Sequence, residues 1–151
     1  MRHPAFEIYA GDAEAIRAAC AADRLDDLRS GKVTPYFALF PEPFTASDIA
    51  LVENAVAVIA GRSEPLEIDR TEEDGGLFVD KIAMPWVDAV AALGPAGAEA
   101  LQVEWSRAYE AQEKEQPEWS KTDRLGLLSK FIGVCRKAKE AGLDLVMVWL
   151  L

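Results

Sequence analysis

The alternation of apolar and polar residues at the start of the chain predicts one strand followed by two short helices. The segment "FEIYAGD", residues 6–12, alternates as a strand does, and Asp12 can cap a helix that runs to about Asp23. A second short helical piece, "RLDDLRSG", stops at Gly31, because glycine readily adopts the conformation that ends a helix.

The next part of the chain predicts an ordered loop and then a buried helix. The segment "VTPYFALFPEPF", residues 33–44, holds three prolines and four aromatic residues, a composition that excludes a regular helix. We expect it to form a loop folded over the core. From Thr45 to Gly61 the apolar residues fall at helical spacing on a wide face, which predicts a largely buried helix.

The middle of the chain predicts a hairpin followed by two helices. The segment "LEIDRTEEDGGLFVDKIAM", residues 66–84, gives two short strands around a polar turn that contains two glycines. Pro85 can open a short helix, and Pro95 can open the next one, which we expect to run through about Glu115.

The end of the chain predicts a helix and a strand. Ser120 is placed to cap the helix and Gly142 to end it. The closing segment "LDLVMVWLL" is apolar after Asp144, a pattern typical of a strand that is covered on both faces.

These elements indicate an α+β protein that is helix-rich and forms a single globular domain over residues 1–151. We expect a small, mostly antiparallel sheet built from the C-terminal strand, the central hairpin and the N-terminal strand. The C-terminal strand should be buried. A chain of this length can remove roughly 70% of its extended surface from water, so no disulfide or metal is needed to stabilise it.

The charge of the chain argues against nucleic acid as a partner. Twenty-six acidic residues against 16 basic ones give a formal charge of −10, which repels a phosphate backbone. The densest basic group, Arg136, Lys137 and Lys139, is too small to form a nucleic-acid patch. An acidic surface instead favours a basic protein as the partner.

The cysteines and the apolar runs predict a cytoplasmic protein. Cys20 and Cys135 are far apart and lack metal-binding or redox spacing, so we expect two buried thiols without a disulfide. No signal-peptide pattern begins the chain, and no apolar run approaches the ~20 residues that span a bilayer. We therefore expect no membrane association.

The residue types present favour a non-enzymatic role. The sole histidine is His3, near the start of the chain, which argues against serine or cysteine nucleophiles activated by histidine. Glycine-rich nucleotide motifs and the Gly-x-Ser-x-Gly elbow are missing from the sequence. We predict no catalytic residue, no cofactor and no metal site.

Three carboxylates remain as candidate binding groups. Glu110 and Glu113 are three residues apart on one helix and would be neighbours, either as an acidic pair or as part of a solvated face. Asp80 lies within an apolar strand, on the side that Phe78 and Ile82 share. A charge there needs a partner, and an edge strand with one solvated face is the expected explanation.

Aromatic residues supply the other candidates. Tyr36 and Phe40, in the proline-rich segment, can present rigid contact area to a partner. Trp105 and Trp119 each lie in a Glu-Trp-Ser tripeptide, but Pro117 lies between them and prevents one continuous helix. Trp105 shares a helix face with Leu101 and Tyr109 and should be core, whereas Trp119 is expected to be partly exposed and able to bind.

The last third of the chain carries a resemblance. Trp105 in a helix, Leu125 and Leu128, and the segment "CRKAKEAGLDLVMVW" with its basic helix end resemble a group of small bacterial cytoplasmic proteins with no assigned activity. The likeness covers about 45 residues and consists mostly of residue types that are common at helix ends. It implies a bacterial cytoplasmic origin and no particular chemistry.

The sequence leaves three hypotheses open. The first is a non-enzymatic acidic protein, similar in role to an immunity protein or antitoxin, that binds a basic protein and is itself a monomer or homodimer. The second is a small-ligand binder or enzyme that uses carboxylates and aromatic residues in a cleft. The third is a structural subunit that forms homo-oligomers.

Overall fold

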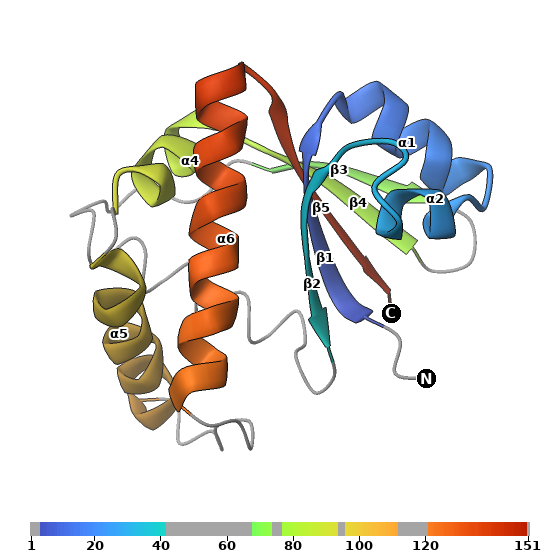
Figure 1. Ribbon diagram of the computed structural model, residues 1–151. Helices are drawn as coiled ribbons and strands as arrows, with labels where there is room; N and C mark the ends of the chain where they lie inside the picture. The colour runs from blue at the N-terminus through green and yellow to red at the C-terminus, as the bar shows by residue number, and fades with distance from the viewer. Residues whose placement is uncertain (1–3, 42–67, 74–76, 94–95, 112–120, 151) are drawn as a thin grey trace.

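The computed structural model describes residues 4–41, 68–73, 77–93, 96–111 and 121–150 (Figure 1). Its strands form one five-stranded sheet in the order β2-β1-β5-β4-β3, in which each neighbouring pair is antiparallel. The strands are β1 (Pro4–Gly11), β2 (Tyr36–Pro41), β3 (Ile68–Glu73), β4 (Leu77–Ile82) and β5 (Asp144–Leu150). The predicted α+β class and antiparallel sheet are confirmed.

The helices cover both faces of this sheet. Two short helices, α1 (Ala13–Ala21) and α2 (Leu25–Arg29), lie on one face, and the other three described helices lie on the opposite side (Figure 1). The three are α4 (Met84–Ala91), α5 (Gly97–Ala111) and α6 (Lys121–Ala141). Of these, α5 packs against α6 and not directly on the sheet. The helix predicted over residues 45–61 lies outside the described residues.

Local sequence signals set the helix ends. Asp12 caps α1, because its Oδ1 accepts a hydrogen bond from the backbone N–H of Glu14 at 2.9 Å. Gly31 follows α2 with φ of +81°, and Gly142 follows α6 with φ of +66°. Both values lie in the left-handed region that glycine enters without a side-chain clash. These predicted boundaries are confirmed.

The prediction of a loop over residues 33–44 is wrong for its central part. Tyr36–Pro41 forms strand β2, which pairs with β1 from Tyr36 opposite Ala10 to Pro41 opposite Pro4. Pro41 is compatible with the strand because it is the last residue of β2, which is an edge of the described sheet, where a missing backbone N–H costs little. The three prolines of the segment favour a loop, but its aromatic residues favour a strand, and pairing with β1 decides between the two.

Strand β5 lies at the centre of the sheet and is buried on both faces, as predicted. Leu145 and Met147 belong to the larger apolar core beneath α4, α5 and α6. Val146 and Val148 belong to the smaller core beneath α1 and α2. Alternate residues of one strand therefore supply two cores, which accounts for an apolar run with no polar alternation.

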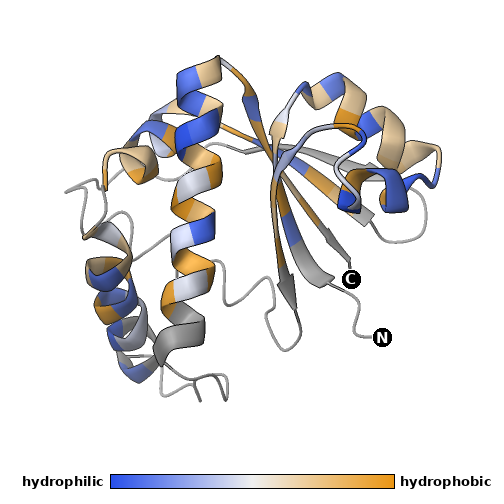
Figure 2. Cartoon of the chain, viewed as in Figure 1, coloured by the Kyte–Doolittle hydropathy of each residue, from blue (hydrophilic) through white to orange (hydrophobic). Residues whose placement is uncertain are grey.

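Hydropathy along the ribbon follows this layering. Figure 2 shows mainly hydrophobic residues on the central strands and a mixture of hydrophobic and hydrophilic residues around α6. The inner side of α6 contributes Leu128, Phe131, Ile132 and Cys135 to the larger core. Cys20 and Cys135 are both buried and neither forms a disulfide, as predicted, and burial raises the pKa of the Cys135 thiol.

The outer side of α6 carries two glycines at positions where the described structure leaves room for a larger side chain. Gly126 and Gly133 are exposed, and a Cβ atom added at either position would meet nothing within 4 Å. Glycine inside a helix costs about 1 kcal/mol relative to alanine. The α6 backbone is therefore left uncovered by side chains along the middle of its outer side.

Trp105 is 1% exposed and lies in the larger core, so its predicted core position is confirmed. Replacing Trp105 by alanine should lower the free energy of unfolding by about 3 to 5 kcal/mol, because a large buried contact area is lost and a cavity remains. Urea denaturation followed by circular dichroism measures this change. The matched control is Val103→Ala on the same helix, where the side chain is 41% exposed and the loss should stay below about 1 kcal/mol.

Candidate functional site

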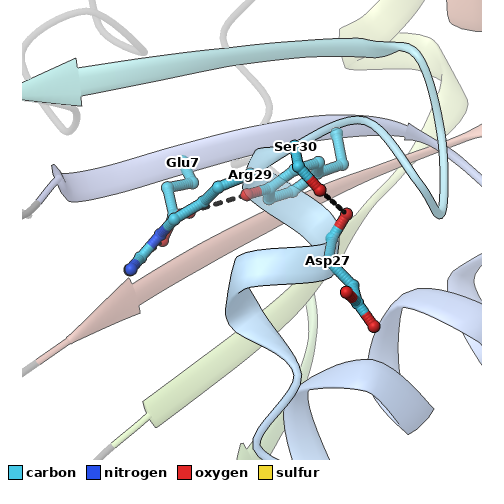
Figure 3. Close-up of polar contacts among 5 residues, drawn as sticks. Glu7, Asp27, Arg29 and Ser30 are labelled. Carbon is cyan, nitrogen blue, oxygen red and sulfur yellow. Dashed lines mark hydrogen bonds and ion pairs between the residues drawn. The ribbon is translucent and has the colours of Figure 1, made fainter.

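The best-defined polar arrangement in the described chain lies between β1 and α2. The Glu7 carboxylate is 1% exposed and accepts two hydrogen bonds from Arg29, at 2.8 Å from Nε and 3.2 Å from Nη2. The hydroxyl of Tyr9 donates a third hydrogen bond to Glu7 Oε1 at 2.6 Å. Figure 3 shows Arg29 reaching from α2 to Glu7 on the neighbouring strand.

The sequence brings these groups together through strand alternation and a short helix. Glu7 and Tyr9 are two residues apart on β1, so both point to the sheet face covered by α1 and α2. Arg29 is the last residue of α2, and the buried Leu28 beside it fixes that helix on the sheet. Glu7 and Arg29 are 22 positions apart in the sequence, yet their side chains form a bidentate pair with two hydrogen bonds.

The electrostatics of this cluster favour a charged pair and a neutral phenol. Hydrogen bonding to Glu7 raises the pKa of Arg29 above its usual value. Burial, followed by the nearby Glu7 carboxylate, raises the pKa of Tyr9 far above its usual value. Tyr9 therefore stays protonated and continues to donate to Glu7 throughout the neutral pH range.

This arrangement is suited to holding α2 in place and is poorly suited to acid–base chemistry. All three donors converge on one carboxylate, so Glu7 is engaged as an acceptor and shielded from solvent. Tyr9 is fully buried, and no substrate atom could reach its hydroxyl without movement of α2. The Arg29 side chain is 20% exposed to solvent.

A second polar group surrounds the start of α1. The Asp144 carboxylate accepts a hydrogen bond from the backbone N–H of Ala13 at 3.1 Å and lies 3.5 Å from Lys81 Nζ. Asp12 caps the same helix end. Asp12 directly precedes α1, and Asp144 begins β5. Both carboxylates stabilise α1 because they neutralise the positive end of the helix dipole.

Asp80 lies in a buried position, and the expectation that it sits on an edge strand with a solvated face is wrong. Strand β4 is internal, because it pairs with β3 on one side and β5 on the other. Asp80 is 2% exposed and has Arg70 of β3 as its register partner. The central hairpin was predicted, but its position beside β5 depends on pairings between distant segments.

The other predicted binding residues are distributed over separate elements. Tyr36 is half-buried on β2, with the Lys137 ammonium 5.3 Å from the centre of its ring. Phe40 is also a β2 residue, and its backbone pairs with Phe6. Glu110 is exposed near the end of α5. Glu113 and Trp119 lie outside the described residues.

The structure does not gather these candidates into one site. Asp80 on β4 is separated from Tyr36 on β2 by the two intervening strands β5 and β1. Glu110 lies on α5, which packs against α6 and away from β2. Of the predicted residues, Glu110 is the one that is both described and exposed to a partner.

Glu110 belongs to an exposed acidic face on α5. We use the term α5 outer face for Glu99, Val103 and Glu110, which are all exposed. The exposed Arg107, which is paired with Glu104, lies on the same side of the helix. Among the described residues, the two large apolar side chains that are exposed are Val103 and Met84, which lies on α4. An apolar side chain between carboxylates gives this face the composition of a small protein-binding surface.

Within the described ranges, no group of three or more histidine, cysteine or acidic side chains is arranged to hold a metal ion. The described helices likewise include none with the length and apolar character needed to cross a membrane.

Comparisons with known proteins give no relative. No family model, no curated protein and no solved structure matches this chain.

The Glu7 cluster is the feature that reasoning from the sequence missed. A usable signal was present, because Glu7 interrupts an apolar strand in the same way that Asp80 does. A buried carboxylate requires a cation, and Arg29 lies two residues before the glycine that ends a predicted helix. The choice among the basic residues of the chain still depends on tertiary packing.

Removing one partner of the Glu7–Arg29 pair should destabilise the protein far more than removing both. Arg29→Met leaves a buried carboxylate without its cation and should cost about 3 to 5 kcal/mol of unfolding free energy. The double variant Glu7→Leu, Arg29→Met should recover part of that loss, because no charge is left unpaired although the buried Tyr9 hydroxyl loses its acceptor. A double-mutant cycle by urea denaturation measures the coupling, and equal, additive effects of the two changes would contradict it.

The protein should lose stability in base through Tyr9. Because folding raises the pKa of Tyr9, its contribution is complete below the unfolded-state value of about 10 and declines as pH rises above it. The expected slope from this residue is about 1.4 kcal/mol per pH unit. The measurement is urea unfolding at increasing pH, with Tyr9→Phe as the control that should show a shallower decline. Equal slopes for the two proteins would count against the assignment.

Proposed function

We propose that this chain is a non-enzymatic binding protein whose acidic surface docks on a basic protein. The observation that carries the proposal is the α5 outer face, where exposed Glu99 and Glu110 surround an exposed Val103. The charge of −10 adds long-range attraction toward a cationic partner and accelerates its encounter.

The acidic character continues in sequence beyond Glu110. Residues 111–120 add Glu113, Glu115 and Glu118 against the single Lys114, and they include Trp119. Tryptophan is among the residues that most often contribute strongly to protein interfaces. This composition supports a recognition role for the sequence that follows Glu110.

The polar clusters of the described chain also support binding over catalysis. Glu7, Tyr9 and Arg29 are engaged with one another, and Asp12 and Asp144 bind the end of a helix. A role like that of an immunity protein or antitoxin, in which carboxylates cover a cationic toxin surface, is the concrete form of the proposal. Such a role requires a stable fold and a charged face, and it requires no reaction at the surface.

The test is capture of a partner with the tagged chain from its native host at low salt, followed by a binding titration with the purified partner. We expect a basic protein whose affinity falls as salt rises, because the contact is largely electrostatic. The double variant Glu99→Lys, Glu110→Lys should weaken binding by at least about tenfold.

The matched control is Glu14→Lys with Asp26→Lys. These exposed carboxylates lie on α1 and α2, on the opposite side of the sheet, and the change alters the net charge equally. Binding by the control should be close to that of the original chain. The proposal fails if no basic partner is captured, or if both double variants weaken binding to the same extent.

A further inference from the structure

Helix α2 and the three residues that follow it form a small unit, which we call the α2 segment, residues 25–32. Backbone N–H groups of residues 27–32 donate to carbonyls of residues 24–28. The Ser30 hydroxyl donates to the Asp27 carbonyl at 3.2 Å (Figure 3), and Lys32 Nζ lies 3.6 Å from the Asp27 carboxylate. These contacts hold the segment together without attaching it to the sheet.

The chain is fixed on each side of the α2 segment. Before it, the backbone N–H of Arg24 donates to a carbonyl of α1 at 2.8 Å. After it, the Thr34 hydroxyl donates to a carbonyl of β1 at 2.6 Å. The backbone is left-handed near both points, at Asp23 with φ of +57° and at Gly31 with φ of +81°. Hinges are formed by a few such positions at the ends of an element.

Two side chains attach the α2 segment firmly to the layer beneath it. Leu28 is fully buried in the smaller core, and Arg29 makes both of its hydrogen bonds to the buried Glu7 carboxylate. Leu25 adds a half-buried contact with the same core. A helix of five residues is not stable by itself in water, so these side chains keep the segment in place.

We propose that the α2 segment is a lid that opens from the sheet as one unit, while the sheet and the larger core stay folded. The Glu7–Arg29 pair holds the lid closed. In the closed state Glu7 and Tyr9 are shielded from solvent, so the lid controls whether their polar groups can meet another molecule. The lid uses no residue of the α5 outer face, so the inference does not depend on the proposed function.

The two cysteines report separately on the two faces of the sheet. Cys20 lies on α1 beside the turn that leads into α2, and it belongs to the same core as Leu28. Cys135 lies in the larger core on the opposite face. Both thiols are buried and neither forms a disulfide. A buried thiol reacts when an opening exposes it, so the labelling rate of each cysteine measures the opening of its own face.

The experiment is labelling of the full chain with N-ethylmaleimide at urea concentrations below the unfolding transition. Peptide mass spectrometry gives the rate at each cysteine, which is divided by the rate in the unfolded chain. We expect relative labelling of Cys20 to be at least about a hundredfold faster than that of Cys135. The rate at Cys20 should change little with urea, because a local opening exposes little surface, whereas the rate at Cys135 should rise steeply.

The variant Trp105→Ala distinguishes local from global opening. It weakens the larger core and should raise the labelling rate of Cys135 by at least about a hundredfold. The contacts of the α2 segment are unchanged, so the rate at Cys20 should stay within about twofold of the original.

The variant Arg29→Met tests the ion pair that holds the lid closed. It should raise the labelling rate of Cys20 by at least about tenfold, because the closed state then buries an unpaired carboxylate. The matched control is Lys32→Met, which removes the same charge from an exposed side chain whose ion pair lies within the segment. The rate at Cys20 in this control should stay within about twofold of the original.

Three results would overturn the inference. They are the same urea dependence at both cysteines, equal acceleration of both by Trp105→Ala, and equal Cys20 rates in Arg29→Met and Lys32→Met. The first comparison uses the original chain, so it decides the matter even where a variant fails to fold.

Discussion

The pairing of β5 between β1 and β4 is the constraint on which the rest of the described structure depends. This strand joins two pairs of strands into one sheet and supplies alternate side chains to the cores on both faces. A register shift of one residue would exchange the two sets of side chains. Helices α1 and α2 on one face, and α4 to α6 on the other, are therefore positioned by a single strand.

The sequence predicts elements whose signals are local. Helix ends at Asp12, Gly31 and Gly142 follow from capping chemistry, and β5 follows from an uninterrupted apolar run. Whether Asp80 is buried, and whether the proline-rich segment forms a strand, depends on which strands become neighbours. Sheet order arises from contacts between distant residues, so local signals alone predict neither β2 as a strand nor β4 as an internal strand.

The candidate site was predicted less well for the same reason. The exposure of Glu110 follows from ordinary helix amphipathicity, but the bidentate pair of Glu7 and Arg29 needs α2 to lie across β1. The buried pair specifies one docked position for a five-residue helix, since a displaced helix would leave a carboxylate in the core without its cation. The exposed Glu110 on α5 is under no such structural demand, because its side chain lies in contact with solvent.

The central place of β5 also has a consequence for how the chain folds during synthesis. It is the last of the described elements to leave the ribosome, so β1 with β2 and β3 with β4 must wait as separate pairs with unpaired edges. Pairing β1 with β5 closes a loop of more than a hundred residues, which makes folding slow. The nascent chain is therefore exposed to aggregation until β5 is inserted between β1 and β4.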